Sequence, residues 1–68
     1  MNVLIEMTAL ARNTPTVDAS PEVKAAWYEA KARLHEHLSM AGPDALQEQA
    51  YAAAAHEHAH KLLSGIAA

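Results

Sequence analysis

The chain has 68 residues, a formal net charge of −3 and no cysteine. This length allows one small domain at most, and the lack of cysteine excludes disulfides, thiolate metal sites and cysteine nucleophiles. The five lysines and arginines form no concentrated basic patch, which argues against a nucleic-acid partner. No apolar run approaches the length of a membrane span, and no signal peptide is visible, so we expect a cytoplasmic protein without a membrane partner.

Large apolar side chains are scarce despite the high hydrophobic fraction. Hydrophobic residues make up 51% of the chain, but alanine alone accounts for about a quarter of it, and alanine buries little area. Domains of this size often need a metal or a partner chain to become stable. We therefore expect self-association, in which two copies share one core.

Residues 1–19 are predicted to form an N-terminal arm and a linker. Val3, Met7 and Leu10 recur at helical spacing, with Leu4 beside them, which favours a short helix that ends before the proline of the linker. A strand with alternate apolar residues is the competing interpretation, because periodicity does not settle a short apolar run. We predict that this arm docks on another chain or is exchanged with it.

Residues 20–41 are predicted to form the first long helix. Ser20 is a favoured N-cap residue, and Pro21 suits the first helical position. At the other end, Gly42 is expected to adopt a left-handed C-cap, and the proline after it prevents continuation.

This helix has two distinct faces. One face carries an apolar stripe whose residues follow one another at steps of three or four, and its expected role is core packing. The stripe consists of Val23, Trp27, Ala30, Leu34 and Leu38. The opposite side carries polar and aromatic residues, namely Lys24, Tyr28, Lys31 and His35.

Residues 43–65 are predicted to form the second long helix. The run from Ala52 to Ala55 allows this helix to approach its neighbour closely. The connection between the two long helices is too short for anything but an antiparallel pair. The expected fold is therefore all-α: an antiparallel helical hairpin preceded by a short N-terminal helix or arm. Two such hairpins are expected to form a four-helix bundle.

The predicted function is non-enzymatic: an interaction or regulatory module that acts through self-association or by binding another protein. Large apolar side chains on the three segments are the candidate interface of a homodimer. The predicted interface residues are Val3, Leu4, Met7, Leu10, Val23, Trp27, Leu34, Leu38, Tyr51, Leu62, Leu63 and Ile66.

The segment from His56 to His60 resembles the H-E-x-x-H signature of zinc peptidases. His56 and His60 are one helical turn apart and can bind one zinc ion, with Glu57 as a general base. A catalytic site needs a third protein ligand and a substrate cleft, which this short chain does not supply, so we expect no enzyme. The alternative function is a Zn, Ni or Cu site that uses these three residues and is shared between chains.

Two other histidines are predicted to lie near apolar surfaces. His37 borders the apolar stripe of the first long helix, so we expect it to be partly buried and hydrogen-bonded. His58 falls on the flank of the second long helix near Tyr51, at the edge of an interface. A pH-sensitive association is an alternative if either histidine is buried between chains.

The expected antiparallel pairing also determines which residues of the two long helices face each other. With the turn at residue 42, His56 should lie level with Tyr28, and His35 and His37 are not expected to meet His56 and His60 within one chain. Trp27 and Tyr51 are candidates for the floor of a small-molecule groove, but no other functional group is predicted to converge on them.

Overall fold

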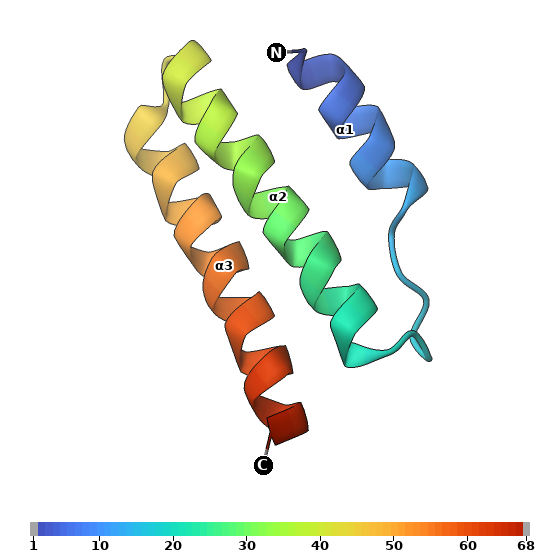
Figure 1. Ribbon diagram of the computed structural model, residues 1–68. Coiled ribbons are helices and arrows are strands. Elements are labelled where there is room, and N and C mark those ends of the chain that lie inside the picture. Colours follow the sequence, from blue (N-terminus) through green and yellow to red (C-terminus); the bar gives the residue numbers. More distant parts are fainter. Residues whose placement is uncertain (1, 68) are drawn as a thin grey trace.

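The computed structural model describes residues 2–67, including the side chains of residues 2–65. It contains three helices, α1 (Val3–Arg12), α2 (Pro21–Ala41) and α3 (Ala45–Ala67), and no strand in this part of the chain. The all-α prediction is confirmed, and the first segment is a helix rather than a strand. Figure 1 shows α2 and α3 side by side as an antiparallel hairpin, with α1 on the other side of α2.

The first two helices begin at side chains that satisfy free backbone N–H groups. Asn2 caps α1, because its Oδ1 accepts a hydrogen bond from the backbone N–H of Ile5 at 3.1 Å. Ser20 caps α2 in the same way, accepting from Val23 at 3.2 Å, and Pro21 follows at the first helical position. Each cap satisfies one of the N–H groups that a helix leaves unpaired at its start. The predicted start of the first long helix is confirmed.

Two predicted helix ends differ in the structure. Gly42 has φ −113° and ψ 173°, so its backbone is extended, and the predicted left-handed cap is wrong. Its N–H donates to the Leu38 carbonyl oxygen at 2.9 Å, and a Cβ at this position would lie 3.1 Å from the same oxygen. Close approach to that carbonyl is therefore what favours glycine. The last helix continues through Gly65 to Ala67, beyond its predicted end, since one glycine weakens a helix by only about 1 kcal/mol relative to alanine.

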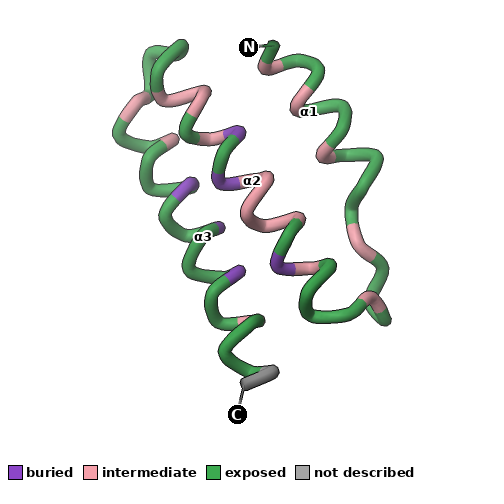
Figure 2. Tube along the Cα trace, in the orientation of Figure 1, coloured by how far each residue is buried: buried purple, intermediate pink, exposed green. Residues whose placement is uncertain are grey.

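Small side chains form the contact between α2 and α3. Figure 2 shows the buried positions facing one another across the hairpin, and Ala59 is 0% exposed. Methyl groups allow close approach of two helices but bury little apolar area. The predicted close approach at the alanine run is confirmed at two of its positions. The buried alanines are Ala25, Ala32, Ala52, Ala55 and Ala59, and Leu34 is the one large buried side chain among the described residues.

Helix α2 is packed from two sides. Trp27 and Leu34 belong to the predicted apolar stripe, which faces α1: the Trp27 indole reaches the backbone of α1. The opposite side carries Tyr28 and His35 as predicted, but it packs on α3. The sequence did not indicate this second contact surface, because alanines mark it rather than large apolar residues.

The three helices lie in one layer. Within the described residues, α1 contacts α2 but not α3, and Figure 1 shows α2 in the middle. The radius of gyration is 12.6 Å, whereas about 11 Å is typical of a compact chain of this length. The accessible surface is 4816 Å², against about 4,200 Å² for a compact monomer of this mass. No described helix is long and apolar enough to cross a membrane.

Candidate functional site

The H-E-x-x-H residues occupy the exposed side of α3. His56 and His60 are both exposed, and the Nδ1 atom of His56 lies 2.7 Å from the carboxylate of Glu29 in α2. Glu57 pairs with Lys61 at 3.3 Å along the same helix. In the described part of the chain, no three His, Asp or Glu side chains are grouped so that they could hold a metal. A shared site between chains stays a prediction, because its third ligand has to come from another copy.

The residues that face one another across the hairpin agree closely with the predicted antiparallel pairing. His56 lies opposite Glu29, and its neighbour His58 stacks on Tyr28, one to two positions from the expected level. His35 pairs with Glu48 near the other end of the hairpin. In the described residues, His35 and His37 are not grouped with His56 and His60 as metal ligands, although His35 lines the same cleft as His58.

All ion pairs between helices in the described residues use histidine. Each Nδ1 atom approaches a glutamate carboxylate on a neighbouring helix, whereas the one lysine pair lies within α3. A histidine pair carries charge attraction only while the imidazole is protonated. The partly buried, hydrogen-bonded state predicted for His37 is confirmed. The three pairs are His37–Glu6 between α2 and α1, His35–Glu48 between α2 and α3, and His56–Glu29 between α3 and α2.

Hydrogen bonds to backbone carbonyls also hold α1 and its linker against α2. The Trp27 indole N–H donates to the Leu10 carbonyl at 2.8 Å, and the Lys24 ammonium donates to Val17 in the linker at 2.8 Å. Nearby, the Thr16 hydroxyl donates to Asp18 at 2.7 Å and lowers the pKa of that carboxyl from its usual value. The bonds from Trp27 and Lys24 hold α1 and its linker beside the apolar stripe of α2.

The side of α1 that faces away from α2 exposes large apolar side chains, and Arg12 also lies there. Leu4, Ile5 and Met7 are 71%, 65% and 48% exposed, and we call these three residues the outer face of α1. The hydroxyl of Thr8, beside them, donates to the Leu4 carbonyl and is thereby satisfied within the helix. Glu6 is turned inward to His37, so the single acidic residue of α1 points at the protein and its aliphatic neighbours point at solvent.

The predicted interface residues divide into two groups. One group is buried or half-buried within the chain: Val3, Leu10, Trp27, Leu34, Leu38 and Leu62. The other group is exposed: Leu4, Met7, Val23, Tyr51 and Leu63. The side chain of Ile66 lies outside the described residues.

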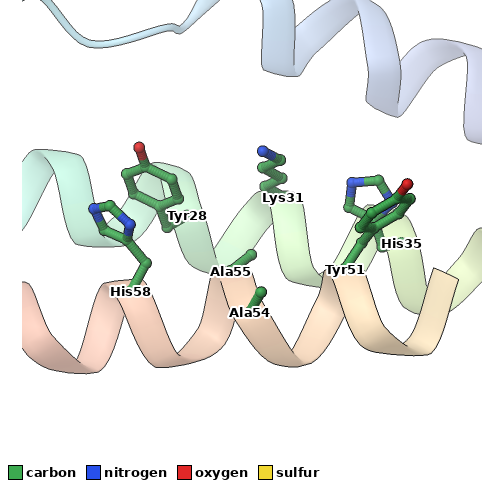
Figure 3. A pocket seen from close by; sticks show the side chains of 7 residues that line it. All are labelled: Tyr28, Lys31, His35, Tyr51, Ala54, Ala55 and His58. Atoms are coloured by element: carbon green, nitrogen blue, oxygen red, sulfur yellow. The ribbon is translucent and has the colours of Figure 1, made fainter. Parts of the chain in front are cut away.

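A cleft opens between α2 and α3 on one face of the hairpin. Figure 3 shows aromatic rings at both ends of the cleft and an ammonium group between them. Trp27, a candidate for such a groove, turns toward α1 instead, and its neighbour Tyr28 lines the cleft. Sequence reasoning missed this arrangement, because only the contact with α3 brings the rings together. The lining residues are Tyr28, Lys31, His35, Tyr51, Ala54, Ala55 and His58.

Comparison of the chain with protein-family models, with curated protein sequences and with solved structures finds no match. Two features of the geometry bear on function: the outer face of α1 and the cleft between α2 and α3.

Proposed function

We propose that this chain is a non-enzymatic helical protein that binds a second copy of itself through the outer face of α1. The observation that carries the proposal is the direction of the α1 side chains: Glu6 points inward, whereas Leu4 and Ile5 point to solvent. A helix with one face in water normally has the reverse arrangement, with polar side chains toward solvent and the apolar stripe toward the core. The exposed apolar side chains on the outer face of α1 are therefore expected to be buried by a partner.

The architecture supports the same proposal. Stable domains are built from two packed layers of secondary structure around a core, and the described chain has three helices in one layer. Its 4816 Å² of accessible surface exceeds the value of about 4,200 Å² expected for a compact monomer. A second copy would supply the second layer.

The outer face of α1 is suited to pairing with its own image. About a twofold axis near the middle of the helix, Leu4 of one copy would lie over Ala11 of the other, so that a large residue meets a small one. Both residues are exposed. The only acidic residue of α1 is engaged with His37, so no carboxylates would repel one another across the axis. A ten-residue helix covers less than the roughly 800 Å² per partner of a standard interface, so we expect a weak dimer.

The test is the mass of the chain in solution as a function of concentration, measured by sedimentation equilibrium from about 10 μM to 1 mM, the range that brackets a weak complex. We expect the wild-type chain to move from its 7.3 kDa monomer toward twice that mass. Leu4→Glu should keep it monomeric throughout, because each interface would bury two charges.

Leu46→Glu is the matched control. Leu46 is 84% exposed and lies at the start of α3, so the same substitution there should leave the dimer unchanged. A wild-type chain that is monomeric at 1 mM would refute the proposal. Equal effects of the two substitutions would place the contact elsewhere and refute the role of α1.

A further inference from the structure

We infer that the cleft between α2 and α3 binds a small planar aromatic carboxylate. The cleft shares no residue with the outer face of α1, so this inference stands apart from the proposed dimer. Its volume of about 340 Å³ lies at the lower end of the range for ligand pockets, which is about 300–1,000 Å³. A ligand with one or two fused rings matches this size.

Two pairs of rings form the ends of the cleft. At one end the rings of Tyr28 and His58 are stacked, with centroids 4.0 Å apart and planes inclined by 14°. At the other end the rings of His35 and Tyr51 are 5.3 Å apart and inclined by 59°. Both pairs join α2 to α3, so the packing of the hairpin holds the four rings in place. Aromatic walls of this kind favour a ligand that is itself a flat ring.

Alanines form the floor between the two ring pairs. Figure 3 shows Ala54 and Ala55 on α3 in the space between the aromatic walls. Because the alanine methyl groups extend only a short way from the α3 backbone, a flat ring can lie close to that backbone. Ala55 also belongs to the buried contact with α2, whereas Ala54 is exposed. The apolar floor excludes a ligand that is charged all round, such as a free phosphate, because part of its charge would lose its hydration.

Lys31 gives the cleft its preference for an anion. It is the only lysine or arginine that lines the cleft, no carboxylate lines it, and Lys31 forms no ion pair with the described residues. Its ammonium lies 5.8 Å from the centroid of the Trp27 ring, a cation–π contact that helps to hold it in position. The carboxylate of Glu48 is already bound to His35.

Tyr28 supplies a second polar group for the carboxylate. Figure 3 shows its hydroxyl and the Lys31 ammonium directed to the same side of the cleft. The Tyr51 hydroxyl, in contrast, accepts a hydrogen bond from Gln47. A ring over the alanine floor would thus place one carboxylate beside Lys31 and Tyr28, where a charge-assisted hydrogen bond is stronger than a neutral one.

The first test compares 1-naphthoate with its uncharged analogue 1-naphthamide, by NMR titration of the 68-residue chain. We expect naphthoate to shift the ring resonances of His58 and Tyr51 and to bind about tenfold more tightly than the amide, a factor that corresponds to about 1.4 kcal/mol. Lys31→Met should remove this preference. Lys61→Met is the matched control, because Lys61 pairs with Glu57 outside the cleft, and it should change nothing.

The second test fills the cleft. Ala54→Leu should abolish the shifts, whereas Ala53→Leu, at a neighbouring exposed position that does not line the cleft, should retain them. Helical content by circular dichroism checks that each variant is folded, and the two lysine variants decide the matter if Ala54→Leu is not. Equal affinity for acid and amide, an unchanged preference in Lys31→Met, or unchanged shifts in folded Ala54→Leu would each overturn the inference.

Discussion

His37 in α2 binds both carboxylate oxygens of Glu6 in α1: its Nδ1 atom lies 2.7 Å from Oε2 and 2.8 Å from Oε1. The two side chains are 28% and 30% exposed. This is the one ion pair between α1 and α2 in the described residues. It turns the acidic residue of α1 inward and thereby leaves Leu4 and Ile5 on the outside.

A double-mutant cycle with Glu6→Gln and His37→Gln should reveal this pair in the free energy of unfolding. We expect a coupling energy of about 1 kcal/mol, typical of a partly exposed pair. Urea denaturation of the wild-type chain, the two single variants and the double variant measures it. Strictly additive effects of the two substitutions would mean that the pair contributes nothing beyond its separate side chains.

Trp27→Phe should loosen α1 from α2. The substitution keeps an aromatic ring but removes the indole N–H that donates to Leu10. A lost hydrogen bond of this kind lowers the free energy of unfolding by about 1 kcal/mol. Hydrogen exchange should show the effect on the amides of α1 more strongly than on those of the hairpin. Uniform loss of protection over all three helices would contradict a local role for this bond.

The contact between α2 and α3 should not tolerate a larger side chain at Ala59. This residue is fully buried among other alanines, so Ala59→Leu should lower the free energy of unfolding by about 1–3 kcal/mol, the usual range for overpacking. Ala53→Leu is the control: Ala53 is exposed on the same helix, and the change should be close to neutral. Thermal and urea unfolding of the pair measure the difference. Similar stabilities for both variants would mean that the hairpin is looser than its buried alanines indicate.

The metal-binding alternative makes its own prediction. Because His56 and His60 lack a third ligand within the described chain, zinc should bind at about one ion per two chains. His60→Ala should abolish that binding, and His58→Ala, a control on another side of α3, should not. Equilibrium dialysis with metal analysis measures the stoichiometry. Zinc binding that persists in His60→Ala would exclude a site at the H-E-x-x-H segment.

Several elements of the fold were predictable because their signals are local. Ser20 and Pro21 mark the start of α2 within a single turn, and Glu57 and Lys61 meet because four residues bring side chains to the same face of a helix. The short connection after α2 imposed the antiparallel pairing, from which the level of His56 followed to within one or two residues. Each of these features depends on neighbours in the sequence.

The surroundings of each helix face were settled only by the tertiary structure. The large apolar stripe of α2 indicated one packed side, but α2 is the middle helix, and its second contact uses alanines that resemble an ordinary helix surface. The partners of Glu6 and Tyr28 lie 31 and 30 positions away in the sequence, beyond the reach of any periodic pattern. The sequence by itself thus determined where the helices begin and which residues share a face. Packing alone decided that Glu6 turns inward and that four aromatic rings meet in one cleft, because both require two helices in contact.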